Sequence, residues 1–177
     1  MALLGRMVEG WRWPLLASGM SFAILLIAHG FERFANLPPC NLCLRQREVY
    51  WALISMSLVG LFLWRVRPNV RFLGALNVLI GLVFVTGAIV AGFHAGVEYG
   101  WWPAPEGCTA PDSAAIVAGQ ALEGDLELDT PVFAPACTDA PWSFGLSMAG
   151  WNVVLSLGLA AISFFAARVT MPAALTA

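Results

Sequence analysis

Four long apolar stretches occupy most of this 177-residue sequence, and they constrain its fold more than any other feature. They cover residues 13–31, 44–64, 72–93 and 144–167, and each supplies the roughly 20 apolar residues that a membrane-spanning helix needs. Because hydrocarbon offers no partner to an unpaired backbone amide, each stretch is predicted to be helical. We therefore expect an all-α membrane protein, an antiparallel four-helix transmembrane bundle that forms a single membrane domain over residues 1–177.

The composition supports this prediction and excludes two other classes of protein. Hydrophobic residues make up 59% of the chain and charged residues only 11%, which is far from the balance of a soluble globular domain. The net charge of −2 provides no basic surface for nucleic acid. We expect the lipid bilayer to be a partner of this chain and nucleic acid not to be one.

The distribution of charge predicts how the bundle is oriented. Arginines near the chain ends and in the short link between the second and third stretches all fall on one side: Arg6, Arg12, Arg65, Arg67, Arg71 and Arg168. The loop over residues 94–143 contains eight acidic residues and no arginine. Since basic residues favour the cytoplasmic side, both termini are predicted to be cytoplasmic and the long loop to face outward. Prolines in that loop exclude a continuous helix, although residues 112–122 are expected to form a short helix that lies either on the membrane surface or against the bundle.

All four cysteines fall on the outward side under this topology. The economical pairing is Cys40 with Cys43 and Cys108 with Cys137, although four cysteines allow three pairings. A Cys-x-x-Cys bridge closes too short a ring to stabilise a fold strongly, and it is typical of thiol–disulfide exchange. The second pair taken alone fits a structural staple, and a four-cysteine zinc site is the third interpretation.

The surroundings of Cys43 give a physical reason for reactivity. Pro38 and Pro39 keep the preceding chain extended, so the second helix is predicted to begin near Cys43, where the helix dipole stabilises a thiolate. Arg47 follows on the same helix face one turn later, with Gln46 and Glu48 beside it as candidates to orient it. An arginine at this depth indicates a function, the alternative being an arginine that reaches up to a lipid phosphate.

Two histidines, His29 and His94, are predicted to lie at the level of the Cys-x-x-Cys segment. His29 fits a hydrogen-bonding residue between helices. His94 is one turn from Glu98 and close to Trp101 and Trp102, which makes it a candidate for acid–base chemistry or ligand binding, although those aromatics also suit a membrane interface.

Three segments together resemble the DsbB family. They are Pro39-Cys40-Asn41-Leu42-Cys43 with Gln46-Arg47, then His94-Ala95-Gly96-Val97-Glu98 with Trp102-Pro103 and Cys108, and last Cys137 with Trp142 and Phe144-Gly145-Leu146-Ser147-Met148. The number of spans, their orientation and the order of the cysteines also resemble that family over nearly the whole chain. The resemblance implies a multi-pass protein of the bacterial inner membrane.

The resemblance also implies an activity, a quinone-dependent oxidase that reoxidises a periplasmic DsbA-type thioredoxin-fold protein. Cys108 would form the mixed disulfide with that partner, and Cys137 would resolve it. Electrons would then pass to Cys40 and Cys43, and from Cys43 to ubiquinone or menaquinone.

Arg47 and His94 complete the site that the resemblance implies. Arg47 would hold the quinone and stabilise the Cys43 thiolate, and His94 would be a second contact to the quinone. No metal or flavin is expected in this chemistry.

Three alternatives stay open at this point. A specialised member of the same family would serve a dedicated partner. A non-enzymatic bundle would use its cysteines structurally or to bind metal. A vitamin-K-epoxide-reductase-like enzyme would carry its quinone-side Cys-x-x-Cys late in the bundle, whereas here it opens the second helix.

Overall fold

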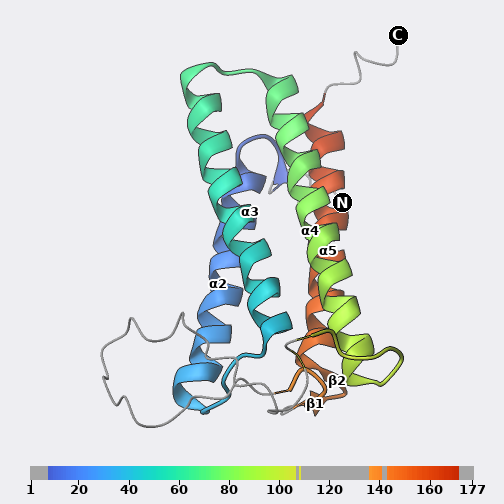
Figure 1. Ribbon diagram of the computed structural model, residues 1–177. Helices are drawn as coiled ribbons and strands as arrows, with labels where there is room; N and C mark the ends of the chain where they lie inside the picture. Colours follow the sequence, from blue (N-terminus) through green and yellow to red (C-terminus); the bar gives the residue numbers. More distant parts are fainter. Residues whose placement is uncertain (1–7, 107, 109–135, 141–142, 172–177) are drawn as a thin grey trace.

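The computed structural model describes residues 8–106, 108, 136–140 and 143–171. Four long helices lie side by side in it (Figure 1): α2 (Arg12–Phe34), α3 (Asn41–Val66), α4 (Val70–Glu98) and α5 (Met148–Thr170). Each is long and apolar enough to cross a membrane. The predicted fold class, a four-helix transmembrane bundle, is confirmed. The short helix expected over residues 112–122 lies outside the described residues.

The helices α3, α4 and α5 begin where a side chain caps the free amide groups of the first turn, whereas α2 has no side-chain cap. Cys40 caps α3 and its sulfur accepts a hydrogen bond from the Cys43 amide, while the Asn69 side chain accepts two amides at the start of α4. The second helix therefore starts near Cys43, as predicted, with its first residue at Asn41 and Cys43 in its first turn. The extended backbone of Cys40, at φ −78° and ψ 171°, ends the Pro38-Pro39 segment and allows helix to begin at Asn41.

The fourth span, in contrast, begins later than its apolar stretch, at Met148 instead of residue 144. Residues 143–147 form a tight antiparallel hairpin, β1 (Ser143–Phe144) and β2 (Leu146–Ser147), which turns at Gly145 with φ +74°. A positive φ favours glycine, so this residue permits the turn. The Ser147 side chain then caps α5 by accepting the Gly150 amide. The apolar stretch over residues 144–167 thus includes both the hairpin and the helix, and apolar character alone does not distinguish them.

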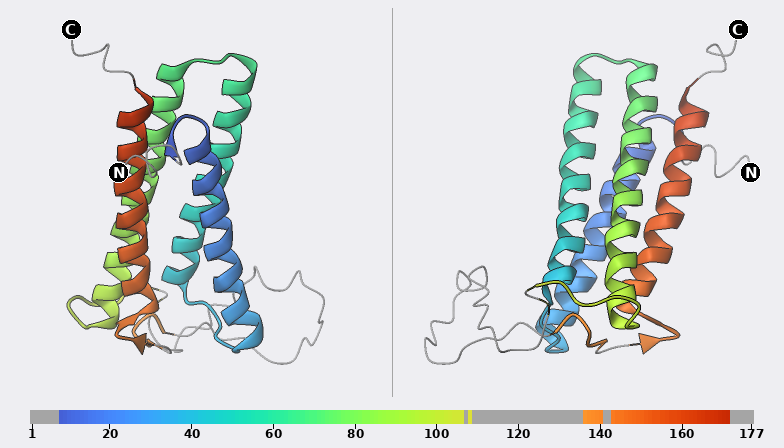
Figure 2. Two further views of the ribbon diagram at one scale, coloured as in Figure 1. Left: turned by 180° about the vertical axis from the view of Figure 1, so that it is seen from behind. Right: turned by 45° about the vertical axis from the view of Figure 1, so that its right-hand side comes forward.

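The bundle packs unevenly around its core. Leu53, Ile80 and Phe84 are fully or almost fully buried between the helices. α4 and α5 pack against each other extensively, whereas α2 and α5 make few contacts (Figure 2). Glycines allow close approach, since a Cβ on Gly81 would meet the Phe164 ring at 2.8 Å. Large apolar side chains such as Ile27, Phe62 and Ile89 point outward, as expected of a surface in contact with lipid.

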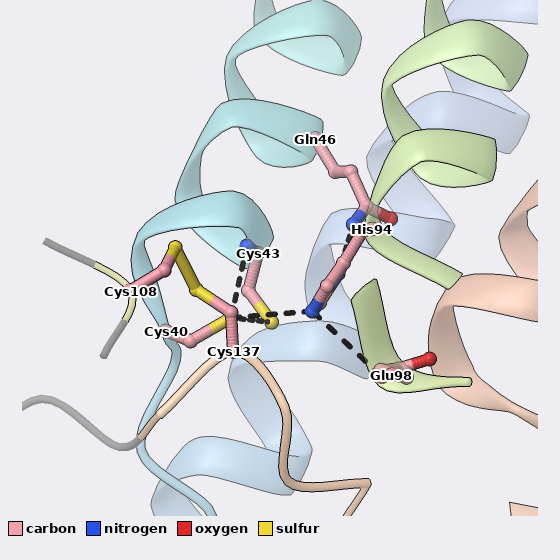
Figure 3. Close-up of a disulfide and its surroundings, with 7 residues drawn as sticks. All are labelled: Cys40, Cys43, Gln46, His94, Glu98, Cys108 and Cys137. Carbon is pink, nitrogen blue, oxygen red and sulfur yellow. Dashed lines mark hydrogen bonds and ion pairs between the residues drawn. A yellow bond between two sulfur atoms is a disulfide. The ribbon is translucent and has the colours of Figure 1, made fainter. Parts of the chain in front are cut away.

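The two ends of the bundle differ in chemistry. The C-terminal ends of α2 and α4 meet the N-terminal ends of α3 and α5, and we call this the cysteine end because all four cysteines lie there (Figures 1 and 3). The opposite end carries the described arginines of the charge pattern: Arg12, Arg65, Arg67, Arg71 and Arg168. The structure thus separates the arginine-rich end from the candidate redox centre by the length of the spans.

Candidate functional site

The four cysteines form one packed cluster at the cysteine end (Figure 3). Cys108 and Cys137 are joined by a disulfide, as predicted, whereas the other predicted pair is not bonded in this structure and Cys40 and Cys43 carry free thiols. Cys40, Cys108, Cys137 and Val97 pack together in a buried cluster, and Cys43 lies against it. A disulfide in contact with a dithiol is the arrangement that thiol–disulfide exchange requires. The two bonded cysteines leave no four-cysteine zinc site in this state.

The two thiols of the Cys-x-x-Cys segment occupy different positions in the first turn of α3. Cys40 Sγ donates a hydrogen bond to Cys43 Sγ at 2.9 Å, and Cys40 is 4% exposed while Cys43 is half-buried. The hydrogen bond to Cys43, and then burial, raise the pKa of the Cys40 thiol above its ordinary value. Cys40 therefore keeps its proton and can share it with a thiolate at Cys43, which lies in the favourable field of the helix N-terminus.

His94 lies directly beside this pair. Its Nε2 atom is 3.5 Å from Cys40 Sγ and 3.7 Å from the Oε1 atom of Glu98, and its Nδ1 atom is 2.7 Å from Gln46 Nε2. The side chains of His94 and Glu98 are each 4% exposed. Ser147, which caps α5, also hydrogen-bonds Glu98. His94 therefore lies at the level of the Cys-x-x-Cys segment, as predicted, and Glu98 lies next to it.

A chain of polar side chains continues from His94 into the membrane-spanning part of the bundle. Gln46 bonds Asn152 of α5, Asn152 bonds Tyr50, and the Tyr50 hydroxyl lies 3.2 Å from Ser156 Oγ. Gln46 thus orients His94, and Glu48 pairs with Arg45, so the expectation that these two residues orient Arg47 is wrong. Sequence reasoning missed Asn152 and Tyr50. The sequence does contain an indication of this contact, because each residue places a strong hydrogen-bonding group inside an otherwise apolar span.

Arg47 faces α2 at the same level. Its guanidinium donates to Glu32 at 2.6 Å, to His29 Nδ1 at 3.1 Å and to the Ala28 carbonyl at 3.3 Å. The Arg47 side chain is mostly buried. Its ion pair with Glu32 compensates the charge and fixes the position of the guanidinium. The expectation that His29 bonds between helices agrees with its contact to Arg47, and Glu32 is a partner that sequence reasoning missed.

A cavity of about 470 Å³ connects these groups. Cys40, Cys43, Arg47 and His94 line one part of it, and apolar side chains of α2 and α5, including Leu25 and Leu155, line the rest. Ile27 also lines it and is 60% exposed on the outer surface of α2, so the cavity lies close to the lipid. Its volume and mainly apolar walls are typical of a small-molecule site.

The comparisons with known proteins agree with this geometry. The sequence profile of the family described as "Disulfide bond formation protein DsbB" matches residues 11–166. This chain belongs to that family. The match includes all four helices, apart from the last residues of α5, and all four cysteines.

Individual relatives are more distant in sequence. The chain is 27% identical over 160 residues to a disulfide bond formation protein B of Alkalilimnicola ehrlichii, covering 87% of this chain and 94% of the relative. It is 30% identical over 150 residues to the protein of the same name from Mannheimia succiniciproducens, covering 81% and 76%. A Shewanella relative of the same name is 28% identical over 145 residues, covering 81% and 79%. No solved structure matches this chain.

Membership in the DsbB family settles the general activity. The protein is a multi-pass membrane protein and a disulfide-generating oxidoreductase. The non-enzymatic bundle is thereby excluded as its main role.

The different environments of Cys40 and Cys43 predict unequal reactivity in the reduced protein. A brief pulse of iodoacetamide should modify Cys43 on the order of tenfold faster than Cys40, because Cys40 is buried and its raised pKa keeps it protonated. Peptide mass spectrometry after a second, isotopically distinct alkylation measures both rates. Denatured protein is the control, in which the two thiols should react at similar rates. Equal rates in the folded protein, or faster reaction of Cys40, would contradict the assignment.

Proposed function

We propose that this protein is a quinone-dependent thiol oxidase that reoxidises a periplasmic DsbA-type thioredoxin-fold protein, either a general or a dedicated one. Electrons pass from Cys108 and Cys137 to Cys40 and Cys43, and then to ubiquinone or menaquinone in the membrane. One observation carries this proposal. The Cys40/Cys43 dithiol contacts the Cys108–Cys137 disulfide and also lines the cavity close to the lipid.

The residues of the cavity fit a quinone. Its apolar walls suit a hydrophobic ring and tail, while the Arg47 guanidinium and the imidazole of His94 are donors for carbonyl oxygens. Cys43 lines the same cavity and is the less buried of the two free thiols. Quinone supplies a membrane-soluble acceptor of two electrons and two protons.

The contact between the two cysteine pairs supports internal disulfide exchange. A reduced Cys108/Cys137 pair attacks the Cys40–Cys43 disulfide through one thiolate, and its second thiol completes the transfer, so one disulfide forms as the other breaks. The pairing seen here, with Cys108–Cys137 oxidised and Cys40/Cys43 reduced, corresponds to the state after this exchange. Cys108 and Cys137 are 2% and 0% exposed, so exchange with the external partner through Cys108 requires this pair to leave the cluster.

His94 is placed to handle protons in the second half of the cycle. When Cys40 and Cys43 close their disulfide, they release two electrons and two protons. His94 Nε2 lies within 3.7 Å of both the Cys40 sulfur and the Glu98 carboxylate. The imidazole therefore accepts or donates a proton beside the sulfur, while Gln46 holds its ring in place.

The proposed location is the bacterial inner membrane, with the cysteine end facing the periplasm and both termini in the cytoplasm. The arginines at the opposite end of the bundle support this orientation. An oxidising compartment at the cysteine end also suits a disulfide-forming centre.

Turnover with purified components tests this function. Reduced DsbA-type protein should drive quinone reduction by the purified membrane protein in detergent, followed by the loss of quinone absorbance. Cys43→Ala should abolish that reduction, yet its Cys108–Cys137 disulfide should still exchange with the reduced partner. If folded wild-type protein reduces neither ubiquinone nor menaquinone, the proposal is wrong. Loss of partner exchange in Cys43→Ala protein at normal levels would contradict the order of electron transfer.

Arg47 should act mainly on the use of quinone. Arg47→Ala is expected to raise the KM for quinone about tenfold or more, because a charged hydrogen-bond donor is lost from the cavity. Arg45→Ala is the matched control, since Arg45 forms an exposed ion pair with Glu48 at 2.9 Å and should leave KM unchanged.

Arg47→Ala also removes the ion-pair partner of Glu32, and this effect needs a separate control. The double variant Arg47→Ala/Glu32→Gln replaces the acidic partner with a neutral one. A KM that stays raised in the double variant assigns the effect to Arg47. An unchanged KM in Arg47→Ala would show that this arginine has no part in binding quinone.

A further inference from the structure

Three potential metal ligands converge at the cysteine end, and a fourth lies next to one of them. Among the described residues, the ligand atoms of Cys40, Cys43 and His94 all lie within 4.8 Å of one another. Glu98 adds a carboxylate, with its Oε1 atom 3.7 Å from His94 Nε2 (Figure 3). Two thiols, an imidazole and a carboxylate on two rigid helix ends are a ligand set that suits zinc.

We propose that the reduced protein binds one Zn²⁺ ion through Cys40, Cys43 and His94, with Glu98 as the fourth ligand, and that the ion blocks oxidation of the dithiol. The oxidation reaction does not need this metal. The bound state is an inhibited form, and it exists only while Cys40 and Cys43 are reduced.

The ligand atoms of Cys40, Cys43 and His94 suit a tetrahedral ion after a small adjustment. Glu98 lies outside the group of atoms that are all within 4.8 Å of one another, so its carboxylate must move toward the sulfurs to become the fourth ligand. Zn–S bonds of about 2.3 Å and Zn–N bonds of about 2.0 Å place sulfur and nitrogen ligands roughly 3.5 Å apart and two sulfurs roughly 3.8 Å apart. The Cys40 sulfur is 3.5 Å from His94 Nε2, and the two sulfurs are 2.9 Å apart. The sulfurs must therefore separate by roughly 0.9 Å to reach that tetrahedral spacing. Cys43 is half-buried and lines the cavity, so its side chain has room to move.

The hydrogen-bond chain behind His94 can support ligation. A histidine that binds metal through Nε2 carries its proton on Nδ1 and donates it to a neighbouring acceptor. With the Gln46 amide turned over, Nδ1–H donates to the Gln46 carbonyl, the Gln46 amino group donates to Asn152, and the Asn152 amino group donates to Tyr50. The same pairs of side chains thus stay hydrogen-bonded when the donor and acceptor roles are reversed. Ser147 similarly holds the Glu98 carboxylate.

The binding step is a proton exchange without electron transfer. Zn²⁺ replaces the protons of the two thiols, which leave to solvent, and forms two Zn–S bonds. A Cys40–Cys43 disulfide has no thiolate to offer, so the oxidised protein should not bind. Zinc and disulfide formation therefore compete for the same two sulfurs.

Direct zinc binding tests the proposal without quinone or partner protein. The full chain in detergent, carrying Cys108→Ser and Cys137→Ser so that only one cysteine pair remains, is reduced, freed of reductant and titrated with Zn²⁺ against a chromophoric chelator. The reduced protein should bind an equimolar amount of zinc and the oxidised protein none. Absence of binding to the reduced protein would overturn the proposal, while leaving the proposed quinone oxidase untouched.

Variants of the other ligands separate this site from an adventitious dithiol complex. His94→Asn should weaken zinc binding by at least about tenfold, Glu98→Gln should also weaken it, and the matched control His29→Asn should not. Unchanged affinity in His94→Asn would mean an adventitious ion on the two thiols only.

Co²⁺ provides a test that needs no ligand substitution. In the reduced protein it should show thiolate charge-transfer bands with the intense visible bands of a tetrahedral site. A six-coordinate cobalt spectrum would overturn the assigned ligand set.

Discussion

Hydrocarbon cannot hydrogen-bond to a polar side chain, and this constraint organises the cysteine end of the bundle. Gln46, Asn152 and Tyr50 lie in membrane-spanning helices and satisfy one another across α3 and α5. The chain they form ends at the His94 ring, which it holds beside the Cys40 sulfur. A polar network that stabilises the helix packing therefore also positions the imidazole at the redox centre.

The redox pair lies where two environments meet. Cys40 ends an extended, proline-rich segment and caps α3, so its sulfur is fixed by the start of the helix rather than by a flexible loop. On one side is the disulfide of the connecting loop, and on the other is the cavity lined by Arg47. Electrons can thus enter from a protein disulfide and leave toward the membrane through two neighbouring sulfur atoms. The same closeness of thiols, imidazole and carboxylate creates the ligand set for zinc.

Several of these features could be predicted from the sequence because they depend on local composition. Apolar length located four spans, and spacing predicted the Cys108–Cys137 bond, although the same reasoning also paired Cys40 with Cys43, whose thiols are free here. The contacts between helices could not be predicted in this way. Gln46 and Asn152 are 106 residues apart, and their contact depends on how α3 and α5 rotate about their axes. The ion pair of Arg47 with Glu32 of α2 depends on helix packing in the same way. The hairpin before α5 was missed because Phe144 and Leu146 are as apolar as the helix that follows.

The central claim is that Cys40 and Cys43 are the residues from which electrons leave the protein. A single-turnover reaction without any partner tests it most directly. Fully reduced Cys108→Ser/Cys137→Ser protein, mixed with quinone in detergent, should form the Cys40–Cys43 disulfide and reduce an equimolar amount of quinone. Reduced Cys40→Ser/Cys43→Ser protein, which keeps the other pair, should reduce none. The opposite result, with quinone reduced only by the protein that retains Cys108 and Cys137, would contradict the account.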